Sequence, residues 1–482
     1  MKFAAFRSLY LLIATLAWAG MAAAQELSSQ LPPPVAAALA AAGIPEANIG
    51  VYVQDVDAKQ PLLAVGADRA LNPASAMKLV TTYAGLSLLG PAYSWNTEIY
   101  TDAPLRKGVL NGDLIIKGYG DPRLTLEDFW LLLGELRQRG VRKIRGDLVL
   151  DRSYFEPAAG DPALFDNEPT RPYNTLPDAL LVNFKAVRFD FIPDPGRHAL
   201  ILLASPSLPQ VRTANHIALD NEPCGDWADR IKLTAADNGT SANLSFDGNY
   251  STACDEQDRE YSVLDHPHYV HALFTLLWRE LGGTFNGGVR DGEVLPTARL
   301  LVTHQSPPLA EIVREINKFS NNVMARQLFL TLGAISGGLP GTTEKAARAI
   351  QQWLMQKGLV FPELMMENGS GLSRDDRISA QSMGKLLLDA FHSPVMPEMM
   401  ASLPVVAVDG TMRKRLVGTD VAGRAHIKTV LLENARSVAG YMLDHQGHRI
   451  VVVFLINHPN AGSAQPAQDA LMEWLYERKY SE

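Results

Sequence analysis

The stretch LNPASAMKLVTTYAGLSLLG, residues 71–90, is the one from which the rest of the sequence is best interpreted. Pro73 favours a chain that is entering a helix, and a long apolar run follows it. Ser75 stands near the expected first turn, and Lys78 follows it by three residues. Residues three apart share one face of a helix, so we expect the Lys78 amine to lie beside the Ser75 hydroxyl.

A serine next to a lysine at a helix start can form a nucleophile. A serine hydroxyl attacks poorly until a base removes its proton. An ordinary lysine, with a pKa of about 10.4, is charged at neutral pH and cannot act as that base. Burial and a second nearby cation would lower this pKa, and the free N–H groups of a helix start suit a developing oxyanion. Because Ser-x-x-Lys also occurs by chance in amphipathic helices, the pattern needs partners elsewhere in the chain.

Two later segments supply such partners. Ser320-Asn321-Asn322 forms a Ser-x-Asn in a short break between two helical segments, and Lys428-Thr429 stands on a predicted strand. Ser-x-x-Lys, Ser-x-Asn and Lys-Thr-Gly, in that order along the chain, mark the penicillin-binding proteins and the serine β-lactamases. The three motifs together make a chance match a poor explanation.

The segments around these motifs are similar to one family. They include PASAMKL, GYGDPRL, PYNTLPDALLVNF, HQSPPLAEIVREINKFSNN, ENGSGLSRDDRISA and AVDGTMRKRL. From residue 48 to the C-terminus the chain resembles the D-alanyl-D-alanine carboxypeptidase/endopeptidases, the PBP4-like (DacB) class C low-molecular-mass penicillin-binding proteins of peptidase family S13. The resemblance implies a serine hydrolase that cleaves D-Ala-D-Ala or D-Ala-diaminopimelate bonds in peptidoglycan stem peptides. It also implies inhibition by β-lactams and no metal or organic cofactor.

The resemblance further implies roles for the residues that match the first two motifs. Ser75 would be the acylated nucleophile, and Lys78 would be its general base. Ser320 would relay a proton toward the leaving group. Asn322 would hold both the substrate amide and Lys78. These roles describe acyl transfer through a Ser75 acyl-enzyme that water then hydrolyses.

The remaining candidates concern substrate binding. By the same resemblance, Lys428 would keep the site positive, and Thr429 would bind the terminal carboxylate of the substrate. The backbone N–H of Leu431 would complete the oxyanion hole together with that of the nucleophile. Arg374 is a further candidate for a substrate carboxylate, with an ordinary ion pair as the alternative. Glu168 could contact the amino end of a diaminopimelate side chain, with a solvated surface acid as the alternative.

The third motif departs from the family pattern, because Val430 stands where the family has glycine. Side chains alternate along a strand, so Val430 should face the same side as Lys428. Glycine in a strand often marks the close approach of a ligand or another backbone. A branched side chain here could crowd the cleft next to Ser75, and the bulky Leu431 and Leu432 follow it.

This departure keeps three functional classes open. The first is an active peptidoglycan D,D-peptidase, which the retained nucleophile, base, Ser-x-Asn and Lys-Thr favour. The second is a catalytically impaired homologue that binds stem peptides. The third is a β-lactamase or an unrelated serine esterase, and the extent of the family segments and the large gap between the first two motifs argue against it.

The two ends of the chain predict the fold. IGVYVQDV and PLLAVGA near the N-terminus, and SVAGYML and RIVVVFLIN near the C-terminus, have strand patterns. The last segment, PAQDALMEWLYERK, carries an apolar helical stripe. We therefore predict a mixed α/β fold with an antiparallel sheet flanked by helices, and the family resemblance implies that it is of the penicillin-binding-protein/β-lactamase type. Residues 25–99 and 266–482 would form this domain, and residues 100–265 a β-rich insertion with few helical stripes.

The N-terminus and the overall charge indicate the compartment and the class of partner. Lys2 and Arg7, an apolar stretch and then Ala22-Ala23-Ala24 are typical of a secretory signal cleaved after residue 24. Without residues 1–24 the formal charge changes from −8 to −10, which argues against nucleic acid as a partner. We expect a periplasmic protein with no transmembrane anchor after cleavage, a membrane anchor being the alternative reading of the N-terminus.

The chain has two cysteines, Cys224 and Cys254. In an exported chain an even pair of cysteines favours a disulfide, and two free buried thiols are the alternative. Both cysteines fall in the predicted β-rich insertion.

Overall fold

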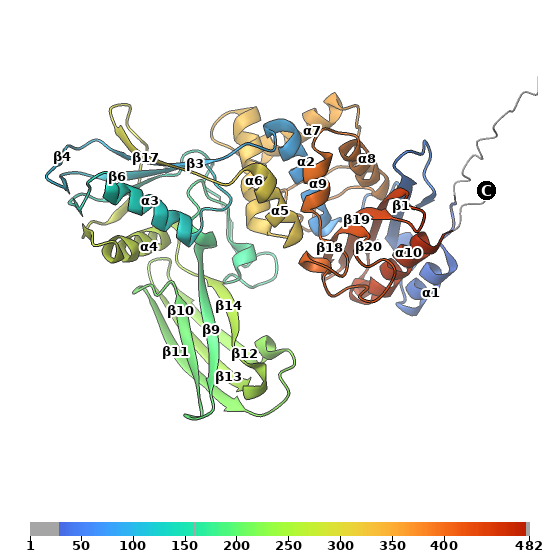
Figure 1. The fold of residues 1–482 in the computed structure, drawn as a ribbon, viewed down its shortest axis with the longest axis horizontal. Coiled ribbons are helices and arrows are strands. Elements are labelled where there is room, and N and C mark those ends of the chain that lie inside the picture. Colours follow the sequence, from blue (N-terminus) through green and yellow to red (C-terminus); the bar gives the residue numbers. More distant parts are fainter. Residues whose placement is uncertain (1–27, 159, 479–482) are drawn as a thin grey trace, which may run out of the picture.

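The computed structural model describes residues 28–158 and 160–478. The predicted signal segment, 1–24, lies outside the described residues. Figure 1 shows an elongated molecule with the first and last helices, α1 (Pro33–Ala41) and α10 (Gln465–Glu477), at one end of its long axis and β4 (Leu105–Arg106) at the other. A separate lobe projects from the middle. None of the helices in the described ranges is long and apolar enough to cross a bilayer.

The predicted antiparallel sheet built from both ends of the chain is confirmed. Its strand order is β18-β19-β20-β1-β2, with every neighbouring pair antiparallel. The strands are β18 (Ala425–Leu432), β19 (Ala435–Leu443), β20 (Arg449–Asn457), β1 (Ile49–Asp55) and β2 (Leu63–Val65). β1 and β20 consist almost entirely of buried residues, because helices cover both faces of the sheet.

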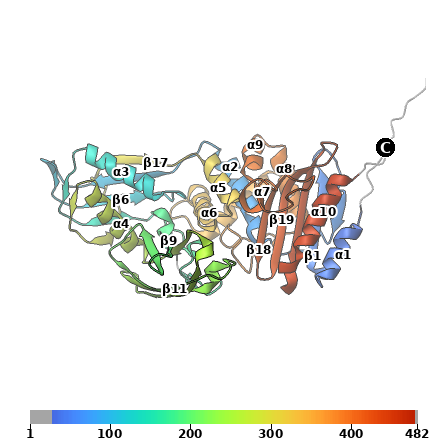
Figure 2. The ribbon, with the colours of Figure 1, turned by 60° about the horizontal axis from the view of Figure 1, so that its bottom comes forward.

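The two faces of this sheet pack on different helices (Figure 2). On one face, α1 (Pro33–Ala41) and α10 (Gln465–Glu477) pack on Val51 and Phe454 and form one core. The opposite face, which includes Tyr52 and Val453, packs on the larger helical layer. That layer holds α2 (Met77–Leu89), α5 (Leu309–Lys318), α6 (Asn322–Gly337), α7 (Thr343–Gln356), α8 (Ala380–Phe391) and α9 (Met396–Ser402). The motif residues lie where this layer meets β18.

The middle of the chain builds the other half of the molecule. One five-stranded sheet has the order β16-β8-β6-β3-β17, and a four-stranded sheet has the order β15-β7-β5-β4. Their strands are β3 (Asn96–Thr101), β4, β5 (Val109–Leu110), β6 (Leu114–Gly118), β7 (Lys143–Ile144), β8 (Leu148–Asp151), β15 (Thr284–Phe285), β16 (Val289–Asp291) and β17 (Arg299–Gln305). Helices α3 (Leu126–Gln138) and α4 (His266–Glu280) pack on them through Phe129 and Phe274.

The projecting lobe consists of two three-stranded sheets, β10-β9-β14 and β11-β13-β12 (Figure 1). Their strands are β9 (Ala186–Asp194), β10 (Ala199–Ser205), β11 (Val211–Asp220), β12 (Ile231–Asp237), β13 (Ala242–Ser251) and β14 (Gln257–Ser262). Phe189, Phe191 and Phe246 pack between the sheets as an aromatic cluster. The lobe shares one hydrophobic core with the two sheets of the middle segment.

The structure differs from the predicted limits of the insertion. The core of the middle segment runs from Ile99 to Val302, so it includes α4 and β15–β17, which lie beyond the predicted end at residue 265. The apolar stripe of α4 packs on this core, and β17 pairs with β3 across more than 190 residues of chain. The segment also contains the 13-residue helix α3, although few helical stripes were expected there. Periodicity predicts a helix but does not reveal the core on which it packs.

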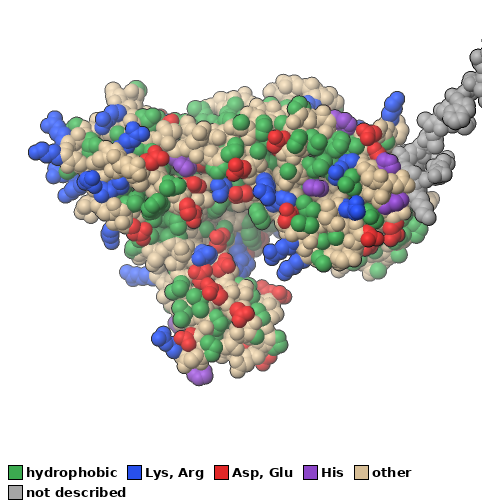
Figure 3. All heavy atoms as spheres, in the orientation of Figure 1, with side chains coloured by type: hydrophobic (Ala, Val, Ile, Leu, Met, Phe, Trp, Pro, Cys, Tyr) green, Lys and Arg blue, Asp and Glu red, His purple; other side chains and the backbone are tan. Residues whose placement is uncertain are grey.

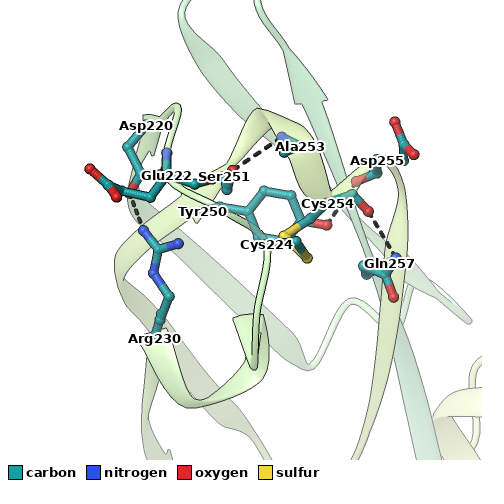
Figure 4. Close-up of a disulfide and its surroundings, with 10 residues drawn as sticks. All are labelled: Asp220, Glu222, Cys224, Arg230, Tyr250, Ser251, Ala253, Cys254, Asp255 and Gln257. Atoms are coloured by element: carbon teal, nitrogen blue, oxygen red, sulfur yellow. Dashed lines mark hydrogen bonds and ion pairs between the residues drawn. A yellow bond between two sulfur atoms is a disulfide. The ribbon is translucent and has the colours of Figure 1, made fainter.

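Cys224 and Cys254 form a disulfide across 30 residues of the lobe. Figure 4 shows the bond beside Tyr250, whose hydroxyl donates to the carbonyl of Asp255 at 2.8 Å. The side chain of Gln257 donates to the carbonyl of Cys254 at 2.9 Å. The disulfide therefore ties the loop after β11 to the turn between β13 and β14.

Candidate active site

Ser75 lies in a short 3-10 turn, η2 (Ala74–Ala76), which leads directly into α2. Ala74 has a left-handed backbone, with φ at +49°. Gly371 also has a positive φ, and a Cβ there would clash with the carbonyl oxygen of Ala74. The glycine therefore lets the loop around residue 370 pack against the serine turn. Ser75 is almost fully buried, with 7% of its surface exposed.

Lys78 is fully buried one turn into the same helical segment. Its Nζ donates to Ser75 Oγ at 2.9 Å, to Asn322 Oδ1 at 2.5 Å and to the carbonyl of Ser370 at 2.6 Å. Burial, followed by the charges of Lys428 and Arg326, holds the pKa of Lys78 well below its usual value. A neutral amine still has two N–H donors, for Asn322 and Ser370, and its lone pair can accept the Ser75 proton.

The Ser-x-Asn motif lies in the predicted break, between α5 and α6. Ser320 has a left-handed backbone, with φ at +58°, which turns its hydroxyl toward β18. The side chain of Asn321 caps α6 by accepting from Met324 N at 3.0 Å. Asn322 is the first residue of α6 and reaches Lys78 from there. The short break thus directs Ser320 toward Lys428 and Asn322 toward Lys78.

Lys428 is the second fully buried lysine of the site. It lies on β18, and its Nζ donates to Ser320 Oγ and to the carbonyl of Thr429, both at 2.9 Å. Burial lowers the pKa of Lys428 to about 7. The Oγ1 atoms of Thr429 and Thr411 are 3.0 Å apart. Lys428, Ser320, Lys78 and Ser75 therefore form two adjacent lysine–serine pairs.

β18 is an edge strand, and its backbone alternation determines where the N–H of Leu431 points. Ile427 N donates to Pro404 O at 2.8 Å, outside the sheet, so this N–H faces the open edge. In an antiparallel ladder the backbone direction repeats every second residue. The N–H of Leu431 therefore also faces the open edge, which is the orientation expected for an oxyanion-hole donor. The side chain of Leu431 is exposed.

Val430 lies on the side of the strand that Lys428 uses, because the two positions are two residues apart. Its cross-strand partner is Ser437, whose hydroxyl donates to the carbonyl of Pro73 at 2.7 Å. Ser437 thereby joins the sheet to the residue two positions before Ser75. The half-buried Val430 side chain lies next to this connection, where the family glycine would leave open space.

Arg374 forms contacts at the rim of the site. Its guanidinium lies 3.4 Å from Glu433, in the β18–β19 turn, donates to Phe165 O at 3.2 Å and stacks over the Phe165 ring. The pair with Glu433 is well exposed on both sides, so it is weak and leaves Arg374 accessible to a ligand. Glu168 is an exposed acid 3.6 Å from Arg171.

A cavity of about 830 Å³ lies beside the loop that contacts Ser75 and Lys78. Residues from four segments line it: the loop between Glu156 and Pro177, one face of α6 including Arg326, residues 341–344 at the start of α7, and the loop from Glu367 to Asp375. Arg374 lines this cavity, whereas Ser75 and Glu168 do not. The loop 367–375 thus has one side against the lysine–serine pairs and the other side in the cavity.

Sequence reasoning assigned no role to several residues that the structure places next to the motifs. Lys318, two residues before Ser320, forms a 2.6 Å ion pair with Asp409 of the AVDGT segment. Ser370 accepts from Lys78 through its backbone carbonyl. Arg326 is 9% exposed, and its Nε has no hydrogen-bond partner among the described residues. The AVDGT and GSG segments, which contain Asp409 and Ser370, are recognisable in the sequence. Their contacts with residues 90 or more positions away are not.

Comparison with known proteins identifies the family of the chain. The model of the D-Ala-D-Ala carboxypeptidase 3 (S13) family matches residues 32–478. The chain is 25% identical over 429 residues to the D-alanyl-D-alanine carboxypeptidase DacB of Haemophilus influenzae, covering 88% of each chain. It is 29% identical over 446 residues to the D-alanyl-D-alanine carboxypeptidase of Actinomadura sp. strain R39, covering 89% of this chain and 81% of that one.

The fold agrees as well. The crystal structure of penicillin binding protein 4 (dacB) from Haemophilus influenzae superposes with a TM-score of 0.77 at 24% identity, covering 92% of this chain and 99% of that one. Both the family model and this structural neighbour span the sheet, the helical layer and the middle segment together. The chain therefore belongs to the D-Ala-D-Ala carboxypeptidase 3 (S13) family of peptidases.

Proposed function

We propose that the protein is a serine-type D-Ala-D-Ala carboxypeptidase that works through a Ser75 acyl-enzyme. The observation that carries the proposal is the contact of 2.9 Å between Ser75 Oγ and the Nζ of a fully buried lysine, Lys78. Burial and two neighbouring cations disfavour the charged form of this lysine. A base whose charged form is disfavoured and that is already hydrogen-bonded to the nucleophile meets the requirement for serine activation.

The first step is attack on the carbonyl carbon of the penultimate D-Ala. Ser75 Oγ forms the new C–O bond as Lys78 takes its proton. The backbone N–H groups of Ser75, at the helix start, and of Leu431, which faces the open edge of β18, would stabilise the resulting oxyanion. The C–N bond then breaks, and the proton returns to the leaving nitrogen through Ser320, which Lys428 holds at 2.9 Å. Water hydrolyses the acyl-enzyme and regenerates Ser75.

Substrate recognition follows from the charges around the nucleophile. The terminal carboxylate of a D-Ala-D-Ala peptide is an anion, and it would accept from Thr429 next to the protonated Lys428. Asn322 would hold the peptide amide with the side-chain nitrogen that faces away from Lys78. Arg374, at the cavity rim, would bind a carboxylate further along the stem peptide.

The same chemistry extends to related substrates and inhibitors. The strained amide of a β-lactam would acylate Ser75 in the first step. The resulting acyl-enzyme would be hydrolysed slowly, because the leaving nitrogen stays covalently attached to the acyl group. Cleavage of D-Ala-diaminopimelate cross-links, which is endopeptidase action, requires only that a larger amine leaves. These substrates are peptidoglycan stem peptides, so we place the protein in the periplasm after export by the N-terminal signal.

A second candidate is a homologue with impaired catalysis that binds stem peptides without turning them over. Val430 favours it, because a branched side chain occupies the face of β18 that Lys428 and the Ser75 turn share. A substrate that adds along the edge of β18 would have to pass this side chain. The retained pairs of lysine and serine favour the active enzyme.

Release of D-Ala from a soluble peptide ending in D-Ala-D-Ala tests the proposal. We expect turnover by the native protein, and a loss of about six orders of magnitude in Ser75→Ala. Val430→Gly is the variant that separates the two candidates. Turnover that appears only in Val430→Gly would support the impaired homologue. Turnover that survives in Ser75→Ala would contradict both readings.

A further inference from the structure

The end of the molecule that is distant from the active site carries a dense group of cations. Two short stretches, residues 105–111 and 139–145, contain six cations and no acidic residue. All six are exposed, and together they are called the basic end: Arg106, Lys107, Arg139, Arg142, Lys143 and Arg145. Figure 3 shows Lys and Arg side chains gathered at this end, over the position of β4 in Figure 1.

Strand alternation explains why cations line one face of the four-stranded sheet there. Arg106 pairs with Val109, Val109 with Lys143, and Lys143 with Thr284, so these four side chains share a face. The next row of pairs points the other way. Its residues Leu110, Ile144 and Phe285 are buried in the core of the middle segment. The apolar row packs the sheet against the core, and the opposite face leaves Arg106 and Lys143 exposed to solvent.

Backbone contacts bring the other cations to the same place. The N–H groups of Arg142 and Lys143 both donate to the carbonyl of Gly108, at 2.8 and 3.0 Å. The turn that carries Lys107 therefore lies against β7. Arg145 donates to the side chain of Asn111 at 3.0 Å, beside the same hairpin. The two stretches of sequence thus form one continuous surface.

The charge of this surface is not neutralised within the protein. Within residues 28–158 and 160–478, none of the six cations forms an ion pair with a carboxylate. The whole chain has a formal charge of −8, so this positively charged surface occurs on a protein that is negatively charged overall. Like charges held together repel one another, and an anionic partner would relieve that repulsion.

We propose that the basic end binds the carboxylate-bearing peptidoglycan polymer on which the active site acts. This inference rests on the proposed function, which brings the protein to a polymer with a carboxylate on every stem peptide. Four of the six cations are arginines, whose planar guanidinium can hold a carboxylate through two hydrogen bonds. Since the basic end and the lysine–serine pairs lie in opposite halves of the molecule, they would contact different repeats of one polymer (Figure 1).

The composition of the surface favours a polymer over a lipid bilayer. The two stretches contain no aromatic residue, and none of their large apolar side chains is exposed: Leu105 and Val109 are half-buried, and Leu110, Val141 and Ile144 are buried. Proteins that lie on a bilayer usually insert exposed apolar or aromatic side chains beside the cations. A second contact on the same polymer raises the effective concentration of cleavable peptides at the active site. It should therefore lower the KM for polymer and leave the turnover of a small peptide unchanged.

A triple variant, Arg142→Gln, Lys143→Gln and Arg145→Gln, tests the proposal. Its matched control is Lys59→Gln, Arg212→Gln and Lys232→Gln, which removes three exposed cations elsewhere. Both are made in the Ser75→Ala background and sedimented with insoluble peptidoglycan at low salt, so that no cleavage occurs. We expect about tenfold weaker binding of the basic-end variant, less than about twofold change in the control, and weaker binding of all proteins at high salt.

Equal binding of both triple variants to peptidoglycan would overturn the proposal. So would loss of binding only to vesicles of anionic phosphatidylglycerol, which would assign the basic end to a membrane. In the Ser75 background, D-Ala release from a soluble peptide should be the same for both variants. If neither the native protein nor the two triple variants with Ser75 released D-Ala, the proposed function would be contradicted. The sedimentation assay would still test peptidoglycan binding by the basic end, because it does not depend on turnover.

Discussion

The side chains of Lys78 and Lys428 are both fully buried, and the charge of Lys428 is the largest electrostatic influence that lowers the pKa of Lys78 after burial itself. Each lysine donates to one serine hydroxyl at 2.9 Å, Lys78 to that of Ser75 and Lys428 to that of Ser320. Two buried cations so close together disfavour double protonation. The site can therefore keep one lysine neutral as a base while the other stays positive.

The pH dependence of kcat/KM should reflect the different protonation states of Lys78 and Lys428. Lys78 must be unprotonated, so kcat/KM rises with pH through the lowered pKa of this lysine. Lys428 must be protonated to attract the substrate carboxylate, and burial lowers its pKa to about 7. We therefore expect kcat/KM for a D-Ala-D-Ala peptide to decrease above about pH 7. A profile that is flat from pH 7 to 10 would contradict the role of Lys428.

Arg326 should act on the reaction through Lys78. Its buried charge lowers the pKa of Lys78, and its Nη1 donates to Thr175 O at 3.2 Å. Arg326→Met removes the charge, so the acid limb of kcat/KM should move to higher pH. Arg326→Lys retains a cation and should restore much of the native profile. A loss of activity with no shift of the acid limb in Arg326→Met would indicate a packing role instead.

The ion pair between Lys318 and Asp409 should position Ser320. Lys318 is nearly buried, and Asp409 also accepts from the backbone of Val405 at 2.8 Å. Asp409→Asn keeps an acceptor but removes the charge, and it should lower the free energy of unfolding by about 1–2 kcal/mol. Acylation by penicillin should slow because the left-handed Ser320 is less well held. Urea unfolding and the acylation rate measure the two effects, and an unchanged acylation rate would show that Ser320 does not depend on the pair.

Removal of the disulfide should destabilise the lobe and spare the site. A bond that closes 30 residues restricts the unfolded chain, and its loss costs about 3–4 kcal/mol in a chain-entropy model. Cys224→Ala with Cys254→Ala should therefore lower the unfolding temperature of the lobe. D-Ala release should be unchanged, since the disulfide lies in a different core from Ser75. Loss of turnover at a temperature where the variant is folded would contradict this separation.

Much of the catalytic half of the molecule could be predicted from the sequence. Long runs such as RIVVVFLIN predict buried strands, and residue spacing alone predicts that Lys78 reaches Ser75. The Ser-x-Asn and Lys-Thr motifs are local, so their elements, the break before α6 and the strand β18, were also predictable. The position of Val430 beside Lys428 follows from strand alternation.

The parts that could not be predicted depend on contacts between distant segments. β17 pairs with β3 although about 200 residues separate them, and the core of the middle segment therefore extends past residue 265 to Val302. The contacts of Lys318 with Asp409 and of Lys78 with the Ser370 carbonyl span 91 and 292 residues. Such pairs follow from the packing of complete cores, which no local pattern encodes.

Covalent labelling of the native protein with a fluorescent penicillin, beside Ser75→Ala and Val430→Gly, tests the central claim most directly. The lysine–serine geometry predicts one label per molecule in the native protein and none in Ser75→Ala. It also predicts that Val430→Gly labels faster, because the space beside Ser75 opens. No label on the native protein and on Val430→Gly, or a label that remains in Ser75→Ala, would contradict the Ser75 acyl-enzyme.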